Sequence, residues 1–187
     1  MEDILELLTS RQAILKGHFL LTSGRHSDVY LEKFRLLEQP DVVDHLGELL
    51  ADGFSGVAVT AVLGGAMGGI LLSHAAARAL GTRGIFAERV DGVLALRRGF
   101  RLSESDAVLI VEDIVTTGGS VGELMSLVRK KNATVVGVAC LVDRSPEGIT
   151  FDVPTHVLLR YPAQSWDENV CPLCRKGIPL VSRGKGG

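Results

Sequence analysis

Short apolar runs rich in β-branched residues alternate with helix-like segments along most of this chain. Such runs are typical of buried strands in a parallel sheet, and they cover residues 57–62, 84–87, 107–111, 134–142 and 156–159. Amphipathic segments typical of helices cover residues 40–50, 67–80 and 121–131. Pro40 suits the first turn of one helix, and Gly81 suits the position just after another. Strands that alternate with helices predict an α/β fold, in which helices flank a central, mostly parallel sheet.

The N-terminal residues have a different pattern and predict a small hood of about residues 1–36. Asp3 is placed to cap a first helix. The apolar face of that helix would consist of Ile4, Leu7, Leu8 and Ile14. Residues 18–21 and 29–31 are expected to form short strands on either side of a polar turn.

We expect a single domain, because 187 residues suit one hydrophobic core with a small appendage. The core sheet would occupy about residues 57–160, and a C-terminal segment would follow over about residues 161–187. Within the core, residues 93–97 and 100–102 predict a protruding hairpin around an Arg-Gly turn. The last residues, 183–187, are basic and rich in glycine, and we expect them to be disordered.

The composition argues against several classes of protein. Hydrophobic residues make up 46% of the chain, which is enough for a sizeable core. The formal net charge is only -2, so no nucleic-acid or membrane surface is indicated. Paired glycines interrupt the apolar segment 57–80, which favours a strand, a loop and a helix over a membrane span. Three cysteines argue against a disulfide framework, and the acidic N-terminus does not resemble a secretory signal. We therefore expect a cytoplasmic protein.

One segment carries most of the chemical information. Glu112 and Asp113 follow the apolar run 107–111, where we expect the strand to end, and residues 116–120 read Thr-Thr-Gly-Gly-Ser. Two carboxylates at the end of a buried strand are costly unless a cation or hydroxyl groups use them. The loop after them can present backbone N–H groups to an anion where a helix begins. The segment predicts a site for a phosphorylated sugar; the alternative is a solvated acidic strand end before a capped helix.

Two further loops are expected beside this one, because ligands bind outside the carboxyl ends of the strands in open α/β sheets. The three loops cover residues 63–68, 112–120 and 143–148. Glycines in the first loop would let the backbone approach an anion closely, or would simply allow tight packing of strand and helix. In the third loop, the guanidinium of Arg144 could bind a carboxylate at two points, or could pair with Asp143.

Residues 108–120 resemble the signature of the type I phosphoribosyltransferases. Segments that resemble the orotate branch of this family are residues 19–30, 141–144, 171–174 and 177–180. The resemblance implies the family fold and an enzyme of pyrimidine (UMP) biosynthesis. Such an enzyme transfers the phosphoribosyl group of phosphoribosyl diphosphate (PRPP) to orotate, giving orotidine 5′-monophosphate and diphosphate. Two alternatives stay open: a purine phosphoribosyltransferase, and a non-catalytic PRPP- or nucleotide-binding regulator on the same fold.

The resemblance also implies roles for individual residues. The carboxylate pair would hold the ribose hydroxyls, and the loop after it would hold the 5-phosphate. The implied PRPP-binding set is Glu112, Asp113, Ile114, Val115, Thr116, Thr117, Gly118, Gly119, Ser120, Gly64, Gly65 and Arg89. Asp113, Glu112 and Arg89 would be catalytic, and Thr116 and Arg144 would bind orotate. The resemblance further implies a homodimer and a Mg²⁺ cofactor, bound mainly through substrate and water.

The chain departs from the usual family pattern in its basic residues. Arg89 stands where a paired lysine is expected, and the lysine and histidine of the family's mobile loop are missing. Candidates for the missing loop charge are Arg97, Arg98 and Arg101. Thr22 takes the place of the hood lysine, and Gly68 takes that of the lysine in the diphosphate loop.

The cysteines leave one question open. Cys171 and Cys174 form a CxxC motif, which supplies only two of the four ligands of a zinc site. Cys140 lies in a predicted core strand and His156 is not obviously close, so we expect a structural turn and leave metal binding undecided. No shared spacing assigns a catalytic role to any of the histidines His18, His26, His45, His74 and His156.

Overall fold

The computed structural model describes residues 3–21 and 23–183. The chain forms two compact units. Leu37–Tyr161 form one of them, here called the core unit. The segments before and after it together form the other, here called the terminal unit. The predicted disordered tail lies outside the described residues, apart from Arg183.

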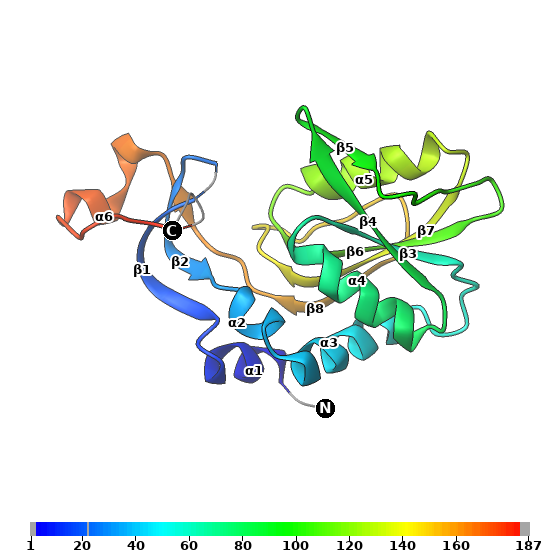
Figure 1. The fold of residues 1–187 in the computed structure, drawn as a ribbon. Helices are drawn as coiled ribbons and strands as arrows, with labels where there is room; N and C mark the ends of the chain where they lie inside the picture. Colours follow the sequence, from blue (N-terminus) through cyan, green and yellow to red (C-terminus); the bar gives the residue numbers. More distant parts are fainter. Residues whose placement is uncertain (1–2, 22, 184–187) are drawn as a thin grey trace. The chain divides into compact units, whose positions relative to one another are not determined.

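A six-stranded sheet forms the centre of the core unit, with the strand order β5-β4-β3-β6-β7-β8 (Figure 1). All neighbouring strands run parallel except β5, which is antiparallel to β4 at one edge. The strands are β3 (Ala61–Gly65), β4 (Arg83–Val90), β5 (Val93–Leu96), β6 (Ala107–Val115), β7 (Thr134–Asp143) and β8 (Thr155–Arg160). The prediction of an α/β fold with a central, mostly parallel sheet is confirmed.

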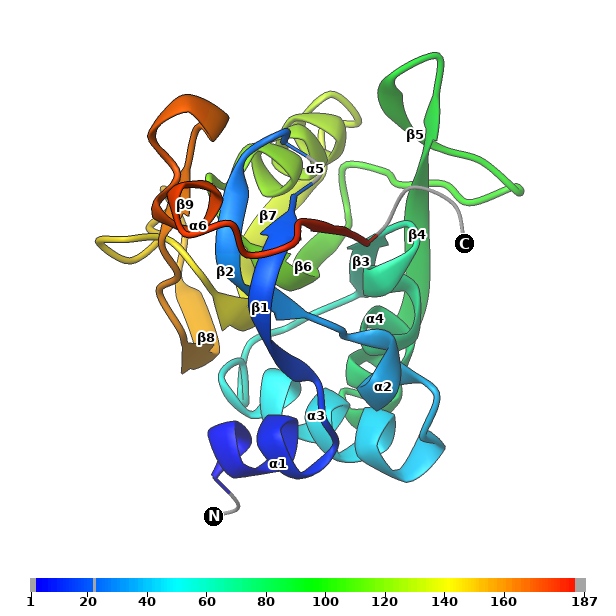
Figure 2. The same cartoon turned by 90° about the vertical axis from the view of Figure 1, so that its left-hand side faces the viewer.

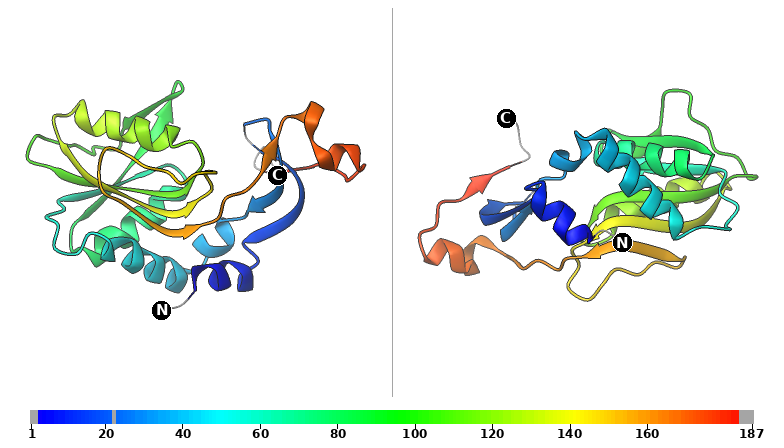
Figure 3. Two further views of the ribbon diagram at one scale, coloured as in Figure 1. Left: turned by 180° about the vertical axis from the view of Figure 1, so that it is seen from behind. Right: turned by 90° about the horizontal axis from the view of Figure 1, so that it is seen from below.

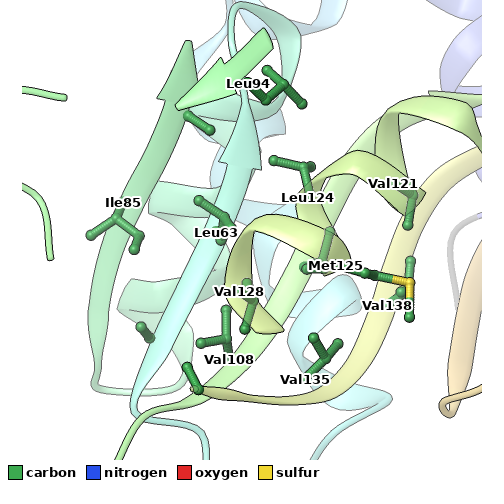
Figure 4. Packing of buried hydrophobic residues seen from close by; sticks show 14 of the residues in the cluster. Leu63, Ile85, Leu94, Val108, Val121, Leu124, Met125, Val128, Val135 and Val138 are labelled. Carbon is green, nitrogen blue, oxygen red and sulfur yellow. The ribbon is translucent and has the colours of Figure 1, made fainter. Parts of the chain in front are cut away.

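Helices cover both faces of this sheet, as Figure 3 shows from behind. One face packs against α3 (Pro40–Asp52) and α4 (Gly68–Ala79), and the other against α5 (Gly119–Arg129). Figure 4 shows Leu124 and Val128 of α5 packed over strand residues such as Leu63. Leu63 and Leu124 are completely buried, and burying a leucine side chain stabilises the fold by about 2 kcal/mol. The α5 helix therefore has a rigid base, and its first residues have a fixed position above the sheet.

The structure corrects the predicted hairpin. β5 pairs with β4 around Asp91 and Gly92, whereas residues 100–102 form no strand. Asp91 and Gly92 have φ values of 50° and 82°, as a two-residue hairpin turn requires, and Asp-Gly is a strong sequence signal for such a turn. Arg98 and Gly99 also have positive φ values, but they form only a local turn after the hairpin.

The largest differences from the predicted strand bounds, four residues each, are at the start of β3 and the end of β6. The strand predicted at residues 57–62 begins only at Ala61, because Val57 is still in a turn, with its N–H bonded to the Phe54 carbonyl. The strand predicted to end at Val111 continues to Val115, which pairs with Asp143 of β7. The acidic pair therefore lies inside a strand rather than after one.

The terminal unit contains a small sheet with the strand order β10-β1-β2-β9. Figure 2 shows β1 and β2 side by side, with α6 near them. The elements are α1 (Ile4–Ser10), β1 (Ile14–Leu20), β2 (His26–Leu31), β9 (Ser165–Trp166), η1 (Glu168–Val170), α6 (Pro172–Arg175) and β10 (Val181–Ser182). A short helix, α2 (Phe34–Leu37), lies at the boundary of the two units.

The first helix is capped as predicted, because the Asp3 side chain accepts a hydrogen bond of 2.9 Å from the Leu5 N–H. Ile14, however, begins β1 and is not part of the helix face. Among the described residues, no helix is long and apolar enough to cross a membrane.

Candidate active site

The carboxyl ends of β3, β6 and β7 lie at one edge of the core sheet, because these strands are parallel neighbours. The three loops singled out in the sequence follow these ends. They are the short connection after Gly65, the loop from Thr116 to Gly118, and the long loop after Asp143. The structure therefore brings the three predicted segments to one edge.

A pocket lies where β6 passes into α5. Its lining consists of Glu112, Ile114, Val115, Thr116, Thr117, Gly118, Gly119, Ser120 and Val121. The α5 helix begins at Gly119 and has no side-chain cap among the described residues. Its first N–H groups are therefore available to a ligand, and together with the helix dipole they favour an anion.

Gly118 gives this loop its shape. Its φ of 77° lies in the left-handed region that favours glycine. A Cβ atom at this position would also lie only 2.9 Å from Ile149 and 3.1 Å from Phe151. Both the backbone conformation and the packing therefore require glycine here. With glycine at this position, the N–H groups at the start of α5 stay accessible to a ligand.

Glu112 faces the pocket. It is 8% exposed, and its Oε1 accepts a hydrogen bond of 3.1 Å from the Asp113 N–H. The other carboxylate oxygen, Oε2, lies 3.6 Å from the position that a Cβ on Gly65 would take. Glu112 thus lies against the end of the neighbouring strand, beside the anion-binding loop.

Asp113 points to the other face of the sheet, because successive residues of a strand alternate. Val108 and Ile110 belong to the apolar cluster under α5, so Glu112 shares their face and Asp113 faces the side that α4 covers. Asp113 is 4% exposed, and its Oδ1 accepts a hydrogen bond of 2.6 Å from the Ile114 N–H. The two acids are adjacent in sequence, but their carboxylates diverge.

The two glycines at the end of β3 serve different purposes. A Cβ on Gly64 would collide with the backbone of Gly69 and lie 2.8 Å from Ser73 Oγ, so Gly64 allows α4 to pack on the strand. A Cβ on Gly65 would make only ordinary contacts, of 3.6 Å and 3.8 Å. For Gly64 the packing interpretation therefore explains the glycine, whereas Gly65 keeps space open in front of Glu112.

Arg89 lies near the first turns of α5, where its guanidinium pairs with the Glu123 carboxylate at 2.9 Å and donates to the Gly92 carbonyl at 2.7 Å. The side chains of this ion pair are 47% and 46% exposed. An exposed pair of this kind contributes at most about 1 kcal/mol. Arg89 can therefore exchange Glu123 for an anionic ligand at little energetic cost.

The loop arginines differ in their partners. Arg98 donates two hydrogen bonds of 3.2 Å to the Glu88 carboxylate, which lowers the pKa of Glu88. The Arg101 carbonyl accepts a hydrogen bond of 2.9 Å from Arg83. For the side chains of Arg97 and Arg101, the described part of the chain offers no hydrogen bond or ion pair. Arg97 and Arg101 are therefore the loop arginines whose guanidinium groups are least constrained, although the charge of Arg97 also lowers the pKa of Glu88.

Arg144 follows β7 and is 9% exposed, and its N–H donates to the Val115 carbonyl at 2.8 Å. The neighbouring Asp143 carboxylate accepts hydrogen bonds from Ser145 and Ile149, and Arg160 lies 3.8 Å away. Burial alone would raise the pKa of Asp143, but these hydrogen bonds and Arg160 lower it. Asp143 thus shapes the loop that carries Arg144, a role that the sequence did not reveal.

Cys140 lies in β7 directly across from Glu112. Burial raises the pKa of its thiol, and the charge of Glu112 raises it further. The thiol therefore stays protonated at neutral pH and is a poor nucleophile or metal ligand.

A family model for the phosphoribosyl transferase domain matches residues 35–152 of this chain, a range that includes the pocket and all three loops. The chain belongs to the phosphoribosyltransferase family. The predicted family resemblance is confirmed, and the α/β architecture described above is the phosphoribosyltransferase fold.

Similarity to relatives covers nearly the whole chain and therefore includes both units of this phosphoribosyltransferase. The orotate phosphoribosyltransferase of Caldanaerobacter subterraneus is 45% identical over 183 residues, which are 98% of this chain and 96% of the relative. The orotate phosphoribosyltransferase of Pelotomaculum thermopropionicum is 46% identical over the same shares. A crystal structure of orotate phosphoribosyltransferase from Aeropyrum pernix has a TM-score of 0.64 and 25% identity, over 96% of this chain and 91% of that one.

Proposed function

We propose that this phosphoribosyltransferase transfers the phosphoribosyl group of PRPP to orotate, giving orotidine 5′-monophosphate and diphosphate in pyrimidine biosynthesis. The observation that carries the proposal is the identity of 45% with an orotate phosphoribosyltransferase over 98% of the chain. The pocket at residues 112–121 supports it, because it combines a carboxylate with an uncapped helix N-terminus.

The pocket suits the two ends of a ribose 5-phosphate. The N–H groups at the start of α5 and the hydroxyls of Thr116, Thr117 and Ser120 would bind the 5-phosphate. The Glu112 carboxylate, which lines the same pocket, would accept hydrogen bonds from ribose hydroxyls. Asp113 faces the side of α4, where the loop after Gly65 would hold the diphosphate. The two acids would thus approach the ribose from different sides.

The reaction requires positioning and charge stabilisation more than covalent help from the protein. The bond between C1 and the diphosphate oxygen breaks, positive charge develops on the ribose ring, and an orotate nitrogen bonds to C1. Carboxylates beside the ring favour this charge, and arginines near the diphosphate favour the leaving group. Arg89 can serve the leaving group because its pair with Glu123 is exposed. Arg144 would bind the orotate carboxylate with its planar guanidinium, and Thr116 would lie beside the base.

Mg²⁺ suits this site, because the Glu112 carboxylate in the pocket offers the kind of oxygen ligand that this ion prefers. Bound mainly through substrate and water, Mg²⁺ would neutralise charge on the departing diphosphate. The residues of the chain would then orient PRPP, while the arginine-bearing segment 97–101 would exclude water. We expect the enzyme to act in the cytoplasm.

A panel of bases tests the proposal directly. The full-length protein is mixed with PRPP and Mg²⁺, and orotate, adenine, hypoxanthine or xanthine is added separately while diphosphate release is measured. We expect release with orotate alone. Release with a purine would assign a purine phosphoribosyltransferase, and PRPP binding without release would assign a non-catalytic regulator; either result would overturn the proposal.

We also propose a homodimer in which the segment 97–101 completes the site of the partner subunit. The test mixes two variants that we expect to have little activity, Glu112→Gln and Arg97→Ala. If sites are shared between subunits, mixed dimers contain one intact site, and activity returns to about a quarter of the wild-type value. Mixing without any gain in activity, or a monomer in sedimentation, would contradict the shared site.

A further inference from the structure

The side chains of two histidines and two cysteines cluster in the terminal unit, although up to 156 residues separate them in sequence. His18 lies in β1 and His26 begins β2, the two strands seen side by side in Figure 2. Cys171 immediately precedes α6, and Cys174 lies within it. One potential ligand atom from each of the four residues lies within 4.8 Å of all the others.

The distances are close to those of a tetrahedral metal site. His18 Nε2 lies 2.9 Å from His26 Nδ1, 3.5 Å from Cys171 Sγ and 3.7 Å from Cys174 Sγ. Cys174 Sγ lies 3.3 Å from His26 Nδ1. Zinc bonds of about 2.0–2.1 Å to nitrogen and about 2.3 Å to sulfur separate tetrahedral ligand atoms by about 3.3–3.8 Å. The four distances given lie within about half an ångström of these values, and no pair of ligand atoms is more than 4.8 Å apart.

The orientation of His18 also suits a ligand. Its Nδ1 lies 2.7 Å from the Ile178 carbonyl oxygen, which can only accept, so Nδ1 carries the hydrogen. In the neutral ring, the lone pair of Nε2 then points at the other three side chains. Metal-binding histidines commonly fix their second nitrogen in this way, by donating to a backbone carbonyl or a carboxylate.

The burial of these side chains argues against a chance grouping of histidines and cysteines on the surface. His18, His26 and Cys171 are at most 3% exposed, whereas Cys174 is exposed. Three ligands are therefore fixed inside the unit, and the fourth leaves an entry path for the ion.

The C-terminal segment needs such a link, because it adds little apolar packing of its own. Among its described residues from Pro162 onward, Cys171 is the one buried apolar side chain, and Val170, Ile178, Leu180 and Val181 are exposed. Its two strands have only two residues each. Small units with little core commonly depend on a metal or a disulfide, and both cysteines here are free.

We propose that His18, His26, Cys171 and Cys174 form a structural zinc site that fastens the C-terminal segment to the β1–β2 hairpin. Two thiolates and two imidazoles in tetrahedral arrangement favour zinc among the divalent ions. Four protein ligands leave no open position for substrate, so the site stabilises the terminal unit and takes no part in the reaction. This proposal is independent of the proposed transfer reaction.

Metal analysis provides the first test. The full-length chain, without a polyhistidine tag, is produced with added zinc and purified without chelator, and its metal content is measured by mass spectrometry. We expect about one zinc per chain. Cys174→Ser and His26→Gln should lose most of the zinc. Cys140→Ala and His74→Gln are matched controls that lie outside the cluster, and they should keep it.

Two further readouts separate ligation from misfolding. Cobalt added to the metal-free wild-type protein should give the visible spectrum of a tetrahedral site with thiolate ligands, and zinc should displace it. Removal of zinc should lower the midpoint of thermal unfolding by about 5 °C or more and speed proteolytic cleavage after Tyr161, and zinc should restore both. Because Cys174 is exposed, Cys174→Ser should keep the circular dichroism of the core unit.

Three results would overturn the proposal. The first is a zinc-replete wild-type protein that contains only traces of metal and gives no cobalt spectrum. The second is an equal zinc content in Cys174→Ser and the wild type. The third is a disulfide between Cys171 and Cys174 in the freshly purified protein, because it would assign the pair to redox chemistry.

Discussion

Glu112 and Gly65 face one another across neighbouring strands, and the Glu112 Oε2 lies 3.6 Å from the point where a Cβ on Gly65 would stand. This relationship joins the acidic strand β6 to the glycine loop after β3. The two glycines at the end of β3 also differ in role, because only Gly64 packs closely against α4.

Replacing each of these glycines by alanine should have a different effect. Gly64→Ala should lower the free energy of unfolding by about 1–3 kcal/mol, because its methyl group would overlap the α4 backbone. Gly65→Ala should keep nearly wild-type stability but raise the KM for PRPP, because it narrows the space before Glu112. Urea unfolding and steady-state kinetics measure the two effects. Equal stability losses in both variants would contradict this division.

Because the carboxylates of Glu112 and Asp113 diverge, replacing each of them should lower the activity by a different factor. Glu112→Gln should lower kcat/KM for PRPP by about a hundredfold, because this carboxylate lines the pocket. Asp113→Asn should also lower turnover, by a smaller factor, since its carboxylate approaches from the face of α4. Circular dichroism should show that both variants stay folded. Wild-type kinetics for Glu112→Gln would remove it from the ribose site.

Arg144→Ala should raise the KM for orotate at least about tenfold and change the KM for PRPP little, because the planar fork suits the orotate carboxylate. Arg144→Lys should restore only part of the affinity, since an ammonium group cannot bind the carboxylate at two points. Arg129→Ala is the control, as Arg129 pairs with Asp152 on the surface. A parallel rise of both KM values would mean that Arg144 supports the loop rather than orotate.

The loop glycine Gly118 should tolerate no side chain. Gly118→Ala combines a positive φ with contacts to Ile149 and Phe151, so it should lose about 2 kcal/mol of stability and most of the activity. Gly122→Ala, one turn later in α5, meets open space and should stabilise the helix by up to about 1 kcal/mol. Thermal unfolding and diphosphate release compare the pair. Full activity in Gly118→Ala would contradict the role of this loop.

Asp106 should make the core unit sensitive to acid. Burial would raise its pKa, but hydrogen bonds from Arg83, Ser103 and Thr60 lower it from 3.8 to about 2. Because the folded pKa lies below the unfolded one, this stabilisation is complete above about pH 4 and disappears as the pH falls toward 2.

Asp106→Asn should therefore lower the free energy of unfolding by about 1–2 kcal/mol at pH 7. The difference from the wild type should shrink between pH 4 and pH 2, as urea unfolding at several pH values would show. Asp152→Asn, in an exposed ion pair, should have little effect at any pH. A constant difference across the acid range would contradict the assignment.

The sequence by itself determined the local features of this protein. The apolar runs gave the parallel strands, Asp3 and Pro40 marked helix starts, and residues 108–120 indicated the family and its phosphate-binding loop. These features depend on neighbouring residues, whose periodicity and turn preferences can be read directly from the chain.

Only the tertiary structure decided the features that depend on register and on distant contacts. The pairing of Val115 with Asp143 extended β6 and so turned Glu112 and Asp113 to opposite faces. β5 pairs with β4 and not with residues 100–102, so the hairpin turn is at Asp91 and Gly92. The small sheet brought two histidines with no shared spacing to a CxxC motif at the other end of the chain. Strand register and long-range packing set these relationships, and neither leaves a periodic signal in the sequence.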